Sequence, residues 1–112
     1  MKHITYTEKS LLVGDEVADL VLRYGAVLAS NGQADTVTLH AVGADGDEVD
    51  ATLLLDAGSN LMAETSNTSL AEPDNADAVM YIRQKIMYLT SPRTALPTDE
   101  TMPATYDELG LE

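Results

Sequence analysis

The chain contains no cysteine among its 112 residues. This absence excludes disulfides, thiolate zinc sites and cysteine nucleophiles, so the protein need not occupy an oxidising compartment. It also lacks an apolar signal-peptide core after Met1, and its longest nearly apolar stretch, residues 17–29, is interrupted by Asp19 and Arg23. That stretch is too short and too polar to cross a bilayer. We therefore expect a cytoplasmic protein with one folded domain.

Basic residues are scarce. Six lysines and arginines stand against 19 aspartates and glutamates, which gives a formal charge of −13. Proteins bind phosphate backbones and anionic lipids mainly through Lys and Arg. The charge therefore predicts no nucleic-acid partner and no membrane partner. Two interpretations of the acidity remain open, namely general solubility and an acidic face for a basic protein partner.

Motifs for catalytic, cofactor or metal chemistry are also missing. The sequence has no P-loop, no G-x-G-x-x-G and no G-x-S-x-G. Its two histidines, His3 and His40, form neither an HxH nor an HExxH pattern, although a zinc site needs ligands at such spacings. The acidic run Asp45–Asp50 is flanked by alternating patterns, so it is interpreted as a hairpin turn and not as a calcium loop. We predict no catalytic residue, no cofactor and no metal site.

The spacing of apolar residues predicts two helices and several strands. Residues 15–30 and 74–90 repeat apolar side chains at helical intervals. Residues 9–14 fit either a strand or the entry to a helix. The resulting order is β-α-β-β-β-α, an α+β fold in which an antiparallel sheet carries two helices packed on one face, with its last three strands as a meander. The segments that alternate as strands do are 3–7, 36–42, 48–56 and 61–66.

The last part of the chain differs in composition. Three of the four prolines fall within residues 91–112, and the apolar residues there show no period. We expect a single α+β domain over residues 1–90 and a flexible, acidic, proline-containing tail over 91–112. Within this tail, Tyr106–Glu112 combines an aromatic residue and two leucines with acids. This segment is either a solvated end or a short recognition motif.

One family resemblance is carried by the runs Glu8–Glu16, Leu55–Gly58, Ala63–Thr65 and Glu72–Asn75. In these runs the chain resembles a group of small uncharacterised acidic proteins encoded in actinobacterial genomes. The resemblance covers residues 3–90 and leaves the tail variable. It implies a bacterial cytoplasmic protein, and it implies no activity because that group has none assigned.

These observations predict function only in outline. The leading hypothesis is a non-enzymatic protein–protein interaction or regulatory domain. The alternative is a small-molecule-binding or enzymatic domain with its site on the polar face of the sheet. A ligand site should be concave with converging polar groups, whereas an interaction domain should expose an apolar patch. The residues predicted to line a ligand site are Thr38, His40, Thr52 and Glu64.

We also expect the protein to self-associate as a homodimer. Outward positions of the predicted strands and one side of the second helix carry more apolar residues than a small monomer usually exposes. Two-fold pairing is the commonest way to cover such a patch. Alternatively, the first strand or the tail covers it within one chain. The predicted interface residues are Val42, Leu54, Met62, Tyr81 and Tyr88.

Overall fold

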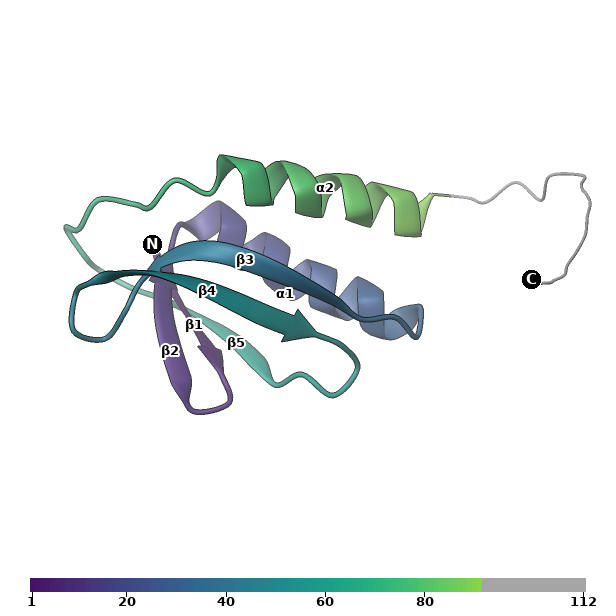
Figure 1. The fold of residues 1–112 in the computed structure, drawn as a ribbon, viewed down its shortest axis with the longest axis horizontal. Helices are drawn as coiled ribbons and strands as arrows, with labels where there is room; N and C mark the ends of the chain where they lie inside the picture. Colours follow the sequence, from purple (N-terminus) through teal and green to yellow (C-terminus); the bar gives the residue numbers. More distant parts are fainter. Residues whose placement is uncertain (92–112) are drawn as a thin grey trace, which may run out of the picture.

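A computed structural model describes residues 1–91, which form an α+β domain with two helices on an antiparallel sheet (Figure 1). This confirms the predicted fold class, and both helices lie close to their predicted bounds. The predicted tail lies, apart from Ser91, outside the described residues. The elements are β1 (Lys2–Tyr6), β2 (Lys9–Val13), α1 (Asp15–Ser30), β3 (Asp35–Val42), β4 (Glu48–Leu55), β5 (Leu61–Thr65) and α2 (Ala76–Thr90).

The segment that fitted either strand or helix is a strand. Residues 9–13 form β2, which pairs antiparallel with β1 in a tight hairpin. Thr7, at the turn of this hairpin, has a φ of 55°, in the left-handed region that glycine or asparagine more often occupies. The hairpin brings Ile4 opposite Leu11, and both side chains are buried in the core.

The sheet has the order β4-β3-β2-β1-β5, so the predicted meander is wrong at its last strand. β5 does not pair with β4; it crosses to the opposite edge and pairs antiparallel with β1, where Ala63 faces Ile4. The alternation of apolar residues in a strand indicates which of its side chains face the core. It does not indicate the neighbouring strand, so the pattern of β5 is compatible with pairing beside β4 or beside β1. Neighbours in sequence usually pair, which is why the meander was expected.

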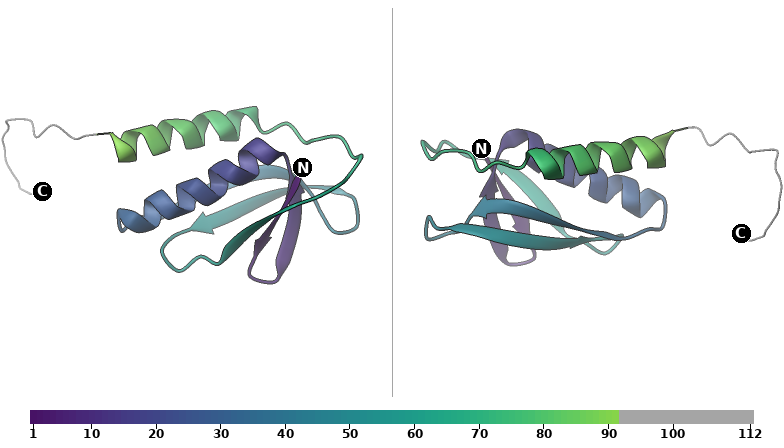
Figure 2. Two further views of the ribbon diagram at one scale, coloured as in Figure 1. Left: turned by 180° about the vertical axis from the view of Figure 1, so that it is seen from behind. Right: turned by 45° about the horizontal axis from the view of Figure 1, so that its top comes forward.

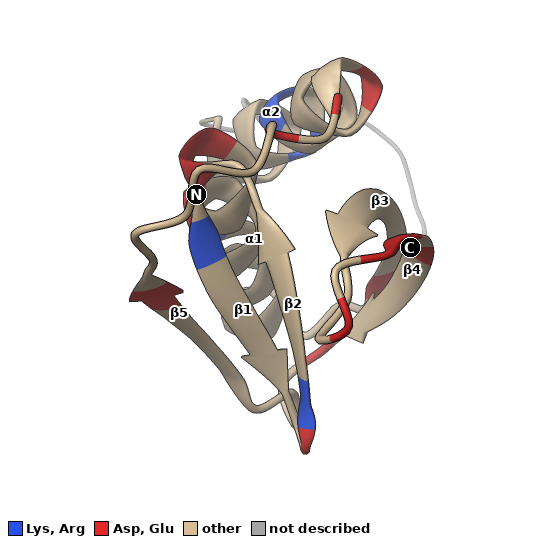
Figure 3. Ribbon diagram, turned by 90° about the vertical axis from the view of Figure 1, so that its left-hand side faces the viewer, with Lys and Arg blue, Asp and Glu red and all other residues tan. Residues whose placement is uncertain are grey.

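The sheet is divided at its centre. β2 and β3 share a single residue pair, Leu12 opposite Val42, after which the two strands diverge. Seen along the helices, β1, β2 and β5 lie on one side and β3 and β4 on the other (Figure 3). The Tyr6 hydroxyl donates a hydrogen bond to the Leu54 carbonyl at 2.6 Å, which joins the far ends of the two halves.

The core lies between this curved sheet and α1. The predicted stripe of α1 is buried, with Val21 and Tyr24 completely shielded from solvent. Helix α2 packs against α1 and contacts β3, so it forms the outermost layer (Figure 2). It turns Ile82, Ile86 and Leu89 inward. No helix among the described residues has the length and apolar character needed to cross a membrane.

Candidate interaction surface

The polar residues predicted to line a ligand site do not all lie together. Thr38 and Thr52 are cross-strand partners on the outer face of β3 and β4, and their hydroxyls are 2.9 Å apart. His40 is next to them, with its Nδ1 2.6 Å from the Asp50 carboxylate. Glu64 is on β5, at the other edge of the sheet. The structure therefore brings three of the four residues together.

The cavity at these residues is small. It has a volume of about 140 Å³ and is bounded by Thr38, His40 and residues 74–78. Ligand pockets usually enclose roughly 300–1,000 Å³. The polar side chains on this face are also satisfied by one another, since each hydroxyl or imidazole has a cross-strand partner. Within the described part of the chain, no three His, Asp or Glu side chains gather as metal ligands would.

The acidic run Asp45–Asp50 lies at the predicted hairpin, with residues 45–47 in the turn and residues 48–50 at the start of β4. Gly46 has a φ of 88°, and Gly43 donates its N–H to the Asp47 carbonyl at 2.8 Å. The Asp45 carboxylate accepts a hydrogen bond from the backbone N–H of Asp47 at 3.1 Å. These hydrogen bonds stabilise the turn from within, and the Asp45 carboxylate points toward the backbone of the loop.

Asn75 is a structural residue that the sequence interpretation did not single out. Among the described residues it is the one buried polar side chain, at 8% exposure. Its Oδ1 accepts the His40 N–H and its Nδ2 donates to the His40 carbonyl, both at 2.8 Å. Because β2 has already diverged at this point, the amide of Asn75 pairs with β3 in place of a neighbouring strand. This contact fixes the start of α2.

A second polar cluster joins the first half of α2 to the core. The hydroxyls of Tyr24 and Tyr81 both donate to the same oxygen of Asp35, each at 2.5 Å. Burial and the hydrogen bond to Asp35 raise the pKa of Tyr24. Burial by itself would raise the pKa of Asp35, but the two tyrosine hydroxyls and the Thr36 N–H outweigh it and lower that pKa. The carboxylate therefore stays charged and ties α1, β3 and α2 together.

The residues predicted as an interface fall on four elements, β3, β4, β5 and α2. Val42 is 6% exposed, so it offers no surface to a partner. Leu54 and Met62 are about half exposed, but β4 and β5 are the opposite edges of the sheet. Tyr81 and Tyr88 lie on the outward side of α2, with 40% and 60% exposure. Of the predicted set, only the two tyrosines share one continuous element.

The outward side of α2 is unusually apolar. Met80 and Met87 are 60% and 66% exposed and lie beside Tyr81 and Tyr88. A surface helix normally directs charged residues to solvent on the side opposite its buried stripe. We call these four residues the α2 outer face. The spacing of the two methionines, seven residues apart, was visible in the sequence, but without the structure it could not be told from a second buried stripe.

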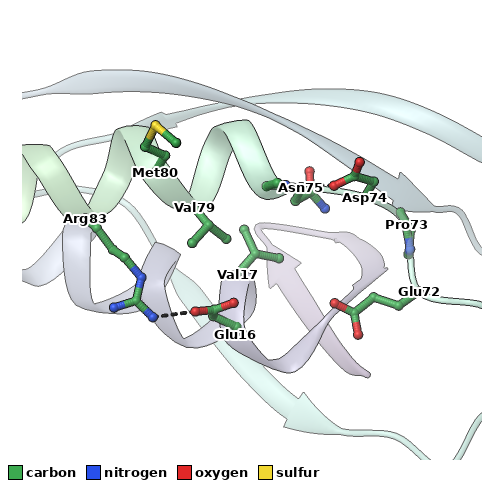
Figure 4. A pocket seen from close by; sticks show the side chains of 10 residues that line it. Glu16, Val17, Glu72, Pro73, Asp74, Asn75, Val79, Met80 and Arg83 are labelled. Carbon is green, nitrogen blue, oxygen red and sulfur yellow. Dashed lines mark hydrogen bonds and ion pairs between the residues drawn. The ribbon is translucent and has the colours of Figure 1, made fainter.

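A groove runs between α1 and α2 beside this face. Its wider part, about 570 Å³, lies where Val17 and Val79 point toward one another (Figure 4). Arg83 reaches across the groove and forms an ion pair with Glu16 (Figure 4). Beyond Arg83 the groove continues toward the end of α2, and this part has a volume of about 320 Å³. This second part, which we call the groove end, is lined by Leu20, Arg23, Arg83, Ile86, Met87 and Thr90.

Comparisons with protein-family models, with curated proteins and with solved structures find no match to this chain, so its function has to be inferred from its own side chains.

Proposed function

We propose that this domain acts through protein–protein contact and that its partner is a second copy of itself, bound through the α2 outer face. The observation that carries the proposal is the exposure of Met80, Tyr81, Met87 and Tyr88 on one helix. Methionine and tyrosine are enriched in protein interfaces, and methionine adapts its shape to a partner. A cytoplasmic homodimer is the form that we propose for the protein.

The α2 outer face has a spacing that suits a two-fold interface. Gln84 lies midway between Met80 and Tyr88, and also midway between Tyr81 and Met87. If two copies of α2 cross antiparallel at Gln84, Met80 of one copy meets Tyr88 of the other, and Tyr81 meets Met87. Such self-complementary contact is what a two-fold axis requires.

The alternative, a ligand-binding or enzymatic site on the polar face of the sheet, has less support. The cavity beside Thr38 and His40 is about 140 Å³. The hydroxyls and the imidazole there are already engaged across the strands. An interaction through α2 needs no rearrangement of these groups, since its apolar side chains are at the surface.

Analytical ultracentrifugation tests the proposal with one matched pair of variants. We expect the wild type to sediment as a dimer at micromolar concentration and Met87→Glu to sediment as a monomer, because the introduced charge would be buried without a partner. The matched control is Leu54→Glu, which places the same charge on an exposed apolar position of β4 and should leave the dimer intact. A wild type that remains monomeric at high micromolar concentration contradicts the proposal. If Leu54→Glu dissociates the dimer and Met87→Glu does not, the interface lies on the sheet and not on α2.

A further inference from the structure

We propose that the C-terminal segment Tyr106–Glu112 binds the groove end of its own chain. This inference does not rest on the α2 pairing proposed above, since it concerns the flank of α2 that faces α1, although Met87 belongs to both surfaces. It gives the acidic tail a specific docking site on the domain that precedes it. The argument rests on the side chains of the groove end, on the composition of the segment and on the length of chain between them.

The groove end combines an apolar floor with two cations. Leu20 and Ile86 form its floor, and Met87 forms part of its rim at 66% exposure. Its ionisable lining residues are two arginines, Arg23 and Arg83. Arg83 forms an ion pair with Glu16, whereas Arg23 makes no ion pair with any residue that the structure describes. A ligand with apolar side chains and carboxylates would suit this lining.

The tail segment has the complementary composition. Tyr106, Leu109 and Leu111 supply apolar side chains, and three acids accompany them within seven residues. Arginine binds carboxylates through two parallel hydrogen bonds, which gives such contacts both strength and orientation. On a chain with a charge of −13, most of the surface repels an acidic segment. At the groove end, by contrast, the local positive charge favours binding of the acidic segment.

The chain is long enough to reach this site. Thr90 lines the groove end, and the chain leaves α2 at the next residue, Ser91. Tyr106 is 15 residues beyond Ser91, and a connection of that length can span up to about 50 Å when extended. So short a connection also keeps the segment near the groove, at an effective concentration on the order of millimolar. Weak contacts then suffice to occupy the groove.

Paramagnetic relaxation measured by NMR on the full chain tests this proposal. Because the chain has no cysteine, Thr105→Cys provides a single attachment point for a nitroxide label. We expect the backbone amides of Leu20, Arg23, Ile86 and Met87 to lose most of their signal intensity, relative to the same sample after the nitroxide is reduced. Amides of β4, on the far side of the domain, should keep theirs.

Two variants carrying the same change of charge separate a specific contact from general attraction. Arg23→Glu should restore the signals at Leu20 and Ile86, whereas Lys9→Glu, which alters an exposed lysine of the β1–β2 hairpin, should leave the broadening unchanged. Broadening that persists in Arg23→Glu, or no broadening in the wild type, overturns the proposal. Broadening seen only when an unlabelled ¹⁵N chain is mixed with a labelled ¹⁴N chain would mean binding between copies, and it overturns docking within one chain.

Discussion

The amide of Asn75 makes two hydrogen bonds to the backbone of His40 and is nearly buried. Removing it leaves the His40 N–H and carbonyl without their partner. We expect Asn75→Ala to lower the free energy of unfolding by about 1–3 kcal/mol, the usual cost of unsatisfied buried polar groups. Chemical denaturation followed by circular dichroism measures this difference.

A matched variant tests the geometry of the same contact. Asn75→Asp keeps the shape and the acceptor for the His40 N–H, but at neutral pH it turns an anion toward the His40 carbonyl. The introduced carboxyl can donate to that carbonyl only when protonated. The stability of Asn75→Asp relative to the wild type should therefore recover as the pH falls toward about 4. Equal stability of the two proteins at pH 7 would refute this account of the bidentate contact.

The lowered pKa of Asp35 predicts how the free energy of unfolding depends on pH in acid. Its pKa is lower in the folded state, since the Tyr24 and Tyr81 hydroxyls and the Thr36 N–H stabilise the charged form more than burial disfavours it. A group with a depressed folded pKa contributes stability above its unfolded pKa and loses that contribution as the pH falls through its folded pKa. We expect the free energy of unfolding to fall below about pH 4, and to fall less steeply in Asp35→Asn. Parallel pH profiles for the two proteins would exclude Asp35 as a source of this dependence.

The candidate surfaces show what could be predicted at the scale of single residues. Tyr81 and Tyr88 were correctly placed at the surface of the second helix, because their positions lie off its buried stripe. Val42 alternates with Thr38 and His40, yet it is buried. Asn75 was missed because its role depends on the backbone of a strand 35 residues earlier. A periodic pattern indicates on which side of a strand or helix a side chain lies. It carries no information on contacts between segments that are distant in the sequence.

Helix α1 contains a glycine where no unusual backbone angle requires one. Gly25 lies in the helix interior, and a Cβ there would meet Leu61 Cδ1 at 3.6 Å, an ordinary contact distance. Glycine destabilises a helix interior by about 0.5–1 kcal/mol relative to alanine. Gly25→Ala should therefore raise the free energy of unfolding by about this amount, as thermal denaturation can show.

The control for this substitution lies at the end of the same helix. Gly32 has a φ of 63° and closes α1, with its own N–H bonded to the Ala29 carbonyl and the Gln33 N–H bonded to the Leu28 carbonyl. This is a left-handed glycine cap, and an L side chain there is strained. Gly32→Ala should destabilise the protein. If both substitutions destabilise it, the packing of α1 against β5 is tighter than the contact distance implies.

At the scale of elements, local signals predicted most of the fold. Both helices, the β3–β4 hairpin and the turn at Gly46 follow from periodicity and turn residues within a few positions of one another. The partner of β5 did not follow, because Leu61 and Ala63 alternate equally well beside β4 or beside β1. Selection between these pairings depends on how α1 fills the concave side of the sheet. That information is spread across the whole chain.

The net charge makes a prediction for the whole molecule. Two copies that each carry −13 repel one another, while the α2 outer face that would join them is apolar. At about 0.15 M ionic strength, charges are screened beyond about 8 Å. We expect the dimer dissociation constant to fall as sodium chloride rises from about 0.05 to about 0.5 M. Sedimentation across this range measures the trend, and a constant that rises with salt would indicate that ion pairs and not apolar contacts hold the copies together.

The crossing of β5 to the far edge of the sheet also sets an order of events as the chain folds. The β1–β2 and β3–β4 hairpins join neighbouring segments, and α1 can form from its own residues. Pairing of β5 with β1 instead closes a loop that contains β2, α1, β3 and β4. Closing so long a loop costs entropy before its contacts can repay it, so this pairing belongs late in the reaction. Until β5 arrives, one edge of β1 remains open to strands of other chains, and the nascent protein is most exposed to misassembly at this edge.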